Sequence, residues 1–177
     1  MIEVRDIYTA VLFNLEEMYR RKHSDPELIE AINAVLRVLN LVLVNRDSNW
    51  VIKETKLKVK NGQARLPDDF VKMKDIYVTK DGETTSFGGE YRIVRDTIYI
   101  DDSGTMDYYF SLPMVETLDD EIDLPSIFLQ LFVRYTTGLI DGTFGTTALD
   151  GLLSSELDTI SNATNYPVIE RPMQFYV

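Results

Sequence analysis

Residues 55–78 predict β-structure in the middle of the chain, and this segment most limits how the protein can fold. Asn61-Gly62 is a two-residue turn sequence, because both residues tolerate the positive φ of a type I′ hairpin. On either side of the turn one face is apolar or β-branched, through Thr55, Leu57, Val59, Ala64 and Leu66. The opposite face before the turn carries Lys56, Lys58 and Lys60. Such alternation predicts two half-buried strands that form a hairpin.

Pro67 removes a ladder donor and should end the second of these strands. The tight turn at residues 67–69 should then direct Phe70 into a core, before a further strand through Ile76 and Val78. More turn sequences lie at 80–83, 95–96 and 101–104 in a β region from about Trp50 to Leu112. Turns this short predict that consecutive strands are antiparallel neighbours.

Helical patterns lie on both sides of the β region. Apolar residues recur at three and four positions from Glu3 to about Arg21, and again from Leu28 to Leu43 after a capping box that begins at Ser24. The short connection predicts that these two helices pack antiparallel. His23 lies at the end of the first helix, where a capping role is favoured over catalysis.

Two more helices are expected after residue 117. The first follows Pro125, buries a face that includes Ile127 and Phe128, and ends at Gly138 or Gly142; the second runs from Ala148 to about Asn162. The sequence thus predicts an α+β fold. A helical body of residues 1–47 and 117–163 contains an inserted antiparallel β lobe, residues 48–116, and an extended tail follows at 164–177.

The tail is predicted to be extended, but it is rich in apolar and aromatic residues, which are rare in disordered segments. The composition therefore predicts that it is buried against another molecule. The residues expected to make these contacts are Tyr166, Pro167, Ile169, Pro172, Met173, Phe175 and Tyr176.

Composition excludes several kinds of site. The chain has no cysteine, so disulfides, thiolate metal sites and cysteine nucleophiles are excluded. Its single histidine, His23, excludes a histidine-rich metal site. Its net charge is −11, and residues 117–177, with two basic and nine acidic side chains, carry −7 of this. Such a chain is unsuited to tight binding of nucleic acid. No apolar run is long enough to span a membrane and no signal pattern precedes the first helix, so we expect synthesis in the cytoplasm.

A search for catalytic motifs finds little. The glycines at 88–89 and 142–145 match neither a P-loop nor a dinucleotide fingerprint. Asp119, Asp120, Glu121 and Asp123 could supply acids for hydrolysis or oxygens for a hard cation, but a solvated acidic turn before a helix is the favoured interpretation. The lysine face is explained as an exposed strand face or guarded edge. We predict no catalytic, cofactor or metal site.

The order of these segments resembles the head-to-tail adaptors of short-tailed bacteriophages, also called connector, tail tubular or head-completion proteins. The resemblance rests on two helices, the step Leu66-Pro67-Asp68-Asp69-Phe70, the strand Ile76-Tyr77-Val78, the aromatic strand Tyr108-Tyr109-Phe110, Leu124-Pro125, a second helix pair and an extended tail. It covers essentially the whole chain.

The resemblance implies a structural protein of the virion neck. About twelve copies would form a ring, a dodecamer, beneath the portal protein, with the tail contacting the portal. The β lobe, including Asn61, Gly62, Leu66, Pro67 and Phe70, would receive the downstream tail protein (nozzle or tail tube). DNA would pass through a channel without sequence-specific binding, and no membrane or cofactor would be involved. The acidic residues expected to face the channel are Asp150, Glu156 and Asp158.

Two other classes of function stay open at this stage. A cellular α+β interaction module would use its helices to form a dimer and its tail as a linear motif. A hydrolase would use Asp119, Asp120 or Glu121, although the sequence offers no second defined acid.

Overall fold

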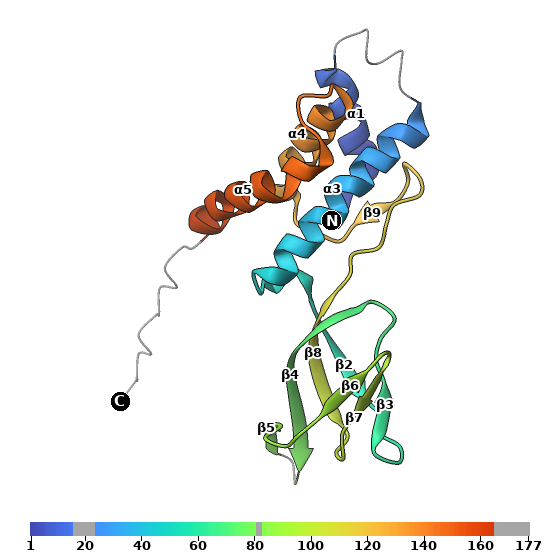
Figure 1. Cartoon of the computed structure of the whole chain (residues 1–177), viewed down its shortest axis with the longest axis vertical. Coiled ribbons are helices and arrows are strands. Elements are labelled where there is room, and N and C mark those ends of the chain that lie inside the picture. Colours follow the sequence, from blue (N-terminus) through green and yellow to red (C-terminus); the bar gives the residue numbers. More distant parts are fainter. Residues whose placement is uncertain (16–23, 81–82, 165–177) are drawn as a thin grey trace, which may run out of the picture.

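A computed structural model describes residues 1–15, 24–80 and 83–164 of the chain. A helical body and a β lobe lie at opposite ends of the long axis, as Figure 1 shows. The predicted α+β fold with an inserted antiparallel β lobe is confirmed. Within the described residues, no helix combines the length and the apolar character that a membrane crossing needs.

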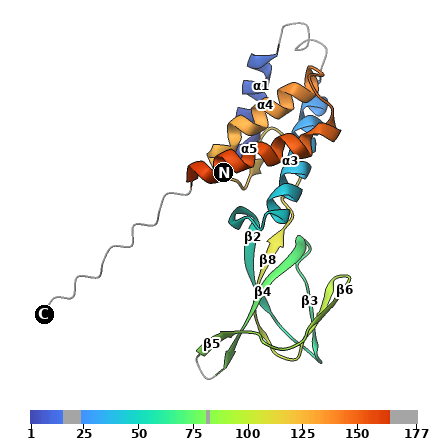
Figure 2. The same cartoon turned by 60° about the vertical axis from the view of Figure 1, so that its left-hand side comes forward.

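The helical body is built around one central helix. Its helices are α1 (Val4–Asn14), α3 (Asp25–Asn45), α4 (Leu129–Ile140) and α5 (Leu149–Thr164). Helix α4 packs against both α1 and α3, and α5 packs against α3 (Figure 2). We expected the two N-terminal helices to pack antiparallel against each other, but the main contacts of both are with α4, and α3 also contacts α5. An apolar stripe shows which face of a helix is buried, but not which helix covers it.

Short 3₁₀ turns lead into three of the longer elements. They are η1 (Asn49–Val51), η2 (Ser126–Phe128) and η3 (Thr146–Ala148). Pro125 precedes η2 directly, as its fixed φ suits the entry to a helix. Phe128 at the end of η2 is completely buried, whereas Ile127, which the periodicity placed on the buried face, is 43% exposed. The 3₁₀ geometry at this point shifts the face by part of a turn relative to an α-helix, which accounts for the error.

The first helix is shorter than its apolar period predicts. Helix α1 ends at Asn14, and Leu15 adopts an extended conformation yet is buried. Because Leu15 contributes to the core in either conformation, burial periodicity could not locate the end. His23 and the residues expected in the last part of this helix lie outside the described residues. The capping box before α3 is confirmed: the Ser24 amide donates to Glu27 Oε2 at 2.7 Å.

Of the two glycines proposed to end the third helix, Gly142 is the correct one. Helix α4 ends at Ile140, and Gly142 has a φ of +76°, which favours glycine after a helix. Gly138 lies inside the helix, where an added Cβ would come within 2.3 Å of Phe144. It is needed for the close approach of that ring.

A small sheet in the body was not predicted. Strands β1 (Ile2–Glu3) and β9 (Glu121–Ile122) pair antiparallel. This pairing joins residues about 120 positions apart, beyond the reach of any local pattern.

The β lobe has two antiparallel sheets. The four-stranded sheet has the order β2-β8-β4-β5, with β2 (Ile52–Leu57), β8 (Gly104–Phe110), β4 (Phe70–Lys80) and β5 (Glu83–Ser86). The three-stranded sheet has the order β3-β7-β6, with β3 (Gln63–Arg65), β7 (Thr97–Tyr99) and β6 (Arg92–Val94).

The inner faces of the sheets are defined by register and burial. Thr55, Met106 and Ile76 form one cross-strand row of the larger sheet, and Met106 is completely buried. In the smaller sheet the equivalent row is Ala64, Ile98 and Ile93, with Ile98 completely buried. Because residues directly opposite one another share a face, the neighbouring rows of each sheet point outward.

The turn at Asn61-Gly62 is confirmed, but the hairpin around it is only one residue pair long. The two residues have φ values of +55° and +74°, and Lys60 and Gln63 bridge across them. The strands on either side then separate: β2 pairs with β8, and β3 pairs with β7. The predicted extended pairing of these two strands is thus wrong.

The turn at 101–104 also connects strands of different sheets, because β7 belongs to the smaller sheet and β8 to the larger. Sequence predicts a turn locally, whereas the partner of each strand is decided by non-local packing. The turn at 95–96 does join paired strands, since Val94 lies opposite Thr97. Lys80 and Glu83 are likewise paired, which supports the turn predicted at 80–83.

Phe70, predicted to enter a core, is only partly buried. Its ring stacks on that of Tyr108, with centroids 5.9 Å apart and planes inclined by 26°. Leu66 is buried as expected, and its amide donates to the carbonyl of Asp96 at 2.8 Å.

Candidate interaction surfaces

Two buried asparagines of α3 bind the irregular segment that leads from the lobe back to the helical body. The side chain of Asn33 accepts from the amide of Val115 at 2.9 Å and donates to its carbonyl at 2.8 Å. The amide of Leu112 donates to Asn40 Oδ1 at 2.9 Å. A buried backbone group without such a partner would be costly. These contacts therefore fix the path of residues 112–115 along α3.

The same junction contains an aromatic contact and an ion pair. Trp50, just before β2, meets Phe128 edge to face, with ring centroids 4.7 Å apart. Lys72 Nζ lies 2.8 Å from Asp47 Oδ1, and this lysine holds the pKa of Asp47 below its ordinary value. The lobe and body thus touch through several side chains from both ends of the insertion.

Asp69 organises the end of the lobe that faces the body. It accepts from Lys53 Nζ at 2.8 Å and from the Tyr108 hydroxyl at 2.9 Å. Burial would raise the pKa of Asp69, but the hydrogen bonds from Lys53 and Tyr108 outweigh it and lower the pKa. Burial, with the hydrogen bond to Asp69, raises the pKa of Tyr108 to about 12. The step Pro67-Asp68-Asp69 of the resemblance therefore includes a structural acceptor.

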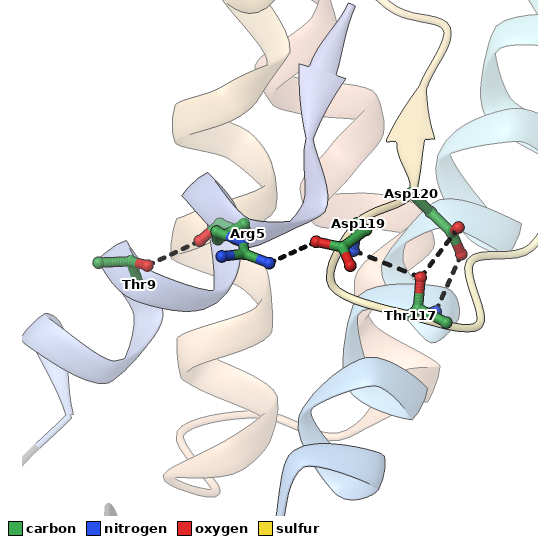
Figure 3. A network of polar contacts seen from close by, with 5 residues as sticks. All are labelled: Arg5, Thr9, Thr117, Asp119 and Asp120. Carbon is green, nitrogen blue, oxygen red and sulfur yellow. Dashed lines mark hydrogen bonds and ion pairs between the residues drawn. The ribbon is translucent and has the colours of Figure 1, made fainter.

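The acidic segment that begins at Asp119, which we predicted to be a solvated turn, starts with a turn in the structure. Figure 3 shows Asp119 paired with Arg5 of α1, and Asp120 turned towards Thr117. Asp120 accepts from the amides of Glu116 and Thr117 at 2.6 and 2.9 Å and from the Thr117 hydroxyl at 3.0 Å. Those backbone hydrogen bonds lower the pKa of Asp120. A general acid needs a raised pKa, so this geometry favours a structural turn.

The three acidic residues predicted to face a channel all lie on α5, but they differ in their surroundings. Asp158 lies 2.5 Å from Arg46 of α3, and this hydrogen bond lowers its pKa. Glu156 accepts from the Tyr135 hydroxyl at 2.6 Å and lies 3.4 Å from Arg134. Asp150 is exposed and makes no ion pair with the described residues. Two of the three carboxylates thus join helices of the same chain.

The free end of the lobe is lined by lysines, as the alternation predicted. Lys56, Lys58 and Lys60 are exposed and form no ion pair with other described residues. Lys58 and Lys60 border a shallow concavity of about 320 Å³ together with Gln63, Arg65 and Thr97. The guarded-edge explanation fits Lys56 on edge strand β2, whereas Lys60 belongs to the surface of the smaller sheet.

The outer faces of the two sheets differ in charge: the larger sheet has a row of acidic residues with Lys56 beside it, and the smaller sheet has mainly basic residues. On the larger sheet, Glu54, Asp107 and Asp75 lie directly opposite one another on three neighbouring strands, and we call them the acidic row. We define the basic face as the outer surface of the smaller sheet with its adjoining lysine. Its residues are Lys60, Gln63, Arg65, Arg92 and Tyr99.

A groove lies between α1 and α4 on the body. It has a volume of about 590 Å³, and its lining includes Ala10, Phe13 and Val133. The side chain of Phe13 is 81% exposed. Among the described residues, no group of three or more histidine or acidic side chains is placed to hold a metal ion.

Sequence reasoning missed Asn33, Asn40, Arg92 and Tyr99. The two asparagines stand seven positions apart in the apolar stripe of α3, a spacing that would have placed both on its buried face. Tyr166, Pro167, Ile169, Pro172, Met173, Phe175 and Tyr176, predicted to contact a portal, lie outside the described residues.

Comparison of the chain with models of known protein families finds no match, and comparison with curated proteins finds none either.

Proposed function

We propose that the protein is a non-enzymatic structural adaptor of a tailed bacteriophage virion. About twelve copies form a ring that joins the portal protein to the downstream tail protein and surrounds a channel for DNA. The proposal rests on the resemblance in element order. One observation carries it further: the β lobe is inserted between α3 and α4 and extends away from the helical body (Figure 1).

Such an elongated shape suits a protein that must contact different partners at its two ends. The body offers helices for the ring wall, while the lobe extends away from it. The buried contacts of Asn33 and Asn40, with the Trp50–Phe128 pair, fix the lobe's direction relative to α3. A fixed direction preorganises every copy of a ring for the same partner.

The tail would supply the contact with the portal. If fully stretched, the 13 residues after Thr164 could reach roughly 45 Å, enough to lie along a neighbouring protein and donate backbone and side-chain contacts. Helix α5, which precedes the tail, is fixed to the body by the buried side chains of Leu149, Leu153 and Leu157.

The decisive experiment is deletion of residues 165–177. We expect helix content and melting temperature to stay nearly unchanged, because the deletion starts after α5, while binding to portal rings of the same virus is lost. Binding is measured by co-sedimentation and by electron microscopy of the mixture. Full-length protein that forms no ring with the portal would contradict the adaptor, and a truncated protein that unfolds would show that the tail belongs to the protein's own fold.

The channel wall is best tested at Asp150. Lysine at Glu156 or Asp158 would also break contacts with Tyr135 or Arg46, so those substitutions mix stability with channel charge. Asp150→Lys changes only an exposed side chain. If this position faces the channel, particles carrying the variant should release DNA more slowly at low salt than at high salt, because salt screens the new attraction to phosphate.

A further inference from the structure

We propose that neighbouring copies in the ring dock lobe to lobe, the basic face of one copy against the acidic row of the next. This inference rests on the proposed function, because it names the contact that would build the ring. The occupant of the basic face is therefore a second copy of this chain.

The acidic row is an unusual arrangement for an isolated sheet. Glu54 on β2, Asp107 on β8 and Asp75 on β4 lie in direct register, so three carboxylates share one outer row. Like charges directly opposite one another destabilise a sheet. None of the three forms an ion pair with another described residue, and the pKa of nearby Tyr77 is raised by burial and by the charges of Asp75 and Asp107. Cations from another molecule would relieve this repulsion.

The basic face has the composition of a protein-binding surface. Lys60 and Gln63 bridge at its border, and Gln63, Tyr99 and Arg92 form one outward row across β3, β7 and β6. The Arg92 guanidinium lies 4.9 Å from the centre of the Tyr99 ring. Tyr99 is 37% exposed, and Val94 on the same face is 43% exposed. Arginine and tyrosine are enriched where protein interfaces gain most of their affinity.

Arg65 belongs to the same face but already has partners. It lies 2.8 Å from Asp68 and 3.8 Å from Asp96, both highly exposed. Lys60 and Arg92 make no ion pair with the described residues. They are consequently the cations that a neighbouring copy would meet.

The positions of the two surfaces suit a closed ring. They are the outer faces of two sheets whose inner faces both contribute to the hydrophobic core, so the two surfaces lie on different sides of the lobe. A contact between unlike surfaces of identical subunits repeats from copy to copy and closes when the rotation allows. Both surfaces lie in the same lobe, at one end of the long axis, so neighbours can stand side by side without a shift along that axis (Figure 2).

The test uses the absence of native cysteine. Gln63→Cys places the only thiol on the basic face, and Thr105→Cys places it beside the acidic row, two residues from Asp107; neither removes a charge. The two full-length variants are mixed and treated with a short thiol cross-linker, with and without portal rings. We expect mixed dimers, in which one copy of each variant is cross-linked to the other. Each variant alone should give few dimers. The yield should fall at high salt, where the screening length is about 3 Å at 1 M.

Two matched substitutions identify the charge that matters. Lys60→Glu, in the Gln63→Cys background, should lower the mixed-dimer yield severalfold. Lys56→Glu makes the same charge change four residues away, but on the outer face of the larger sheet beside the acidic row. In the Thr105→Cys background it should leave the yield unchanged or raise it. Circular dichroism verifies that both variants keep the fold.

The outcomes separate this contact from the adaptor itself. Rings on the portal without mixed cross-links would overturn the lobe-to-lobe contact and leave the adaptor standing. The lobe-to-lobe contact would also be overturned if Lys60→Glu lowered binding of the downstream tail protein but not cross-linking, since the basic face would then bind that protein. Mixed cross-links without any portal-bound ring would support the contact and contradict the adaptor. Dimers of the Gln63→Cys variant alone would indicate a two-fold contact and overturn the proposal.

Discussion

The helical body and the β lobe differ in what their charged side chains contact. In the body, each arginine of the described residues lies in an ion pair: Arg5, Arg37, Arg46 and Arg134 meet Asp119, Glu30, Asp158 and Glu156. In the lobe, Lys56, Lys58, Lys60, Lys74, Arg92 and Arg95 make no ion pair with the described residues. Exposed ion pairs add little stability. The body's described arginines therefore meet acids of their own chain, whereas only some lobe cations do so: Lys53, Lys72 and Arg65 are paired, and the six named above have no acidic partner among the described residues.

The largest effect should come from the apolar core of the body, since its ion pairs are exposed. Leu39→Ala removes a completely buried side chain of α3 and should lower the free energy of unfolding by about 2–5 kcal/mol. Leu41 lies two residues away on the same helix and is 54% exposed. Leu41→Ala should change stability far less. Urea unfolding of both variants measures the difference, and equal losses would show that the exposed face of α3 also carries stability.

Substitutions in the contacts that join the body to the lobe should have the next largest effect on stability. Asn33→Leu leaves the amide and the carbonyl of Val115 without their partners and should lower stability by roughly 2–4 kcal/mol, from the cost of two unpaired buried groups. Asn40→Leu loses one such contact, with the Leu112 amide, and should cost about half as much. Hydrogen exchange at Val115 should quicken in the first variant. If Asn40→Leu proves the more damaging, the lobe is fixed mainly near its own strands.

The smallest effect concerns acid stability at the end of the lobe that faces the body. The pKa of Asp69 is lower in the folded protein than its usual value near 3.9, so its contribution is complete above that pH. The contribution is lost as pH falls through the lower, folded-state pKa. Asp69→Asn should therefore be less stable than the parent at neutral pH, with the gap closing below about pH 4. Thermal melts across this range provide the test, and a gap that widens in acid would contradict the assignment.

Local signals predicted the elements well. The capping box at Ser24 located the start of α3, and the positive φ tolerated by Asn61 and Gly62 located a turn that the structure contains. Both depend on residues within four positions of one another. The alternation of Lys56 and Lys60 with apolar residues likewise predicted which side chains are exposed.

The sequence did not predict which strands pair or which distant residues contact each other. The pattern around Asn61-Gly62 was satisfied equally by a hairpin and by two strands that pair elsewhere, because both arrangements bury Leu57 and Ala64. Asn33 was hidden by its apolar neighbours, and its partner Val115 lies 82 residues away. The basic face was missed for a similar reason, since β3, β6 and β7 contribute its residues from separate segments.

The pairing of β2 with β8 has a consequence for how such a protein can change. Ile52 lies directly opposite Tyr109, so the chain enters and leaves the lobe at neighbouring points. An insertion whose ends meet can be exchanged for another of the same spacing without moving the host helices. A lineage could therefore replace the lobe by recombination and acquire a new binding partner while α1, α3, α4 and α5 keep their own contacts.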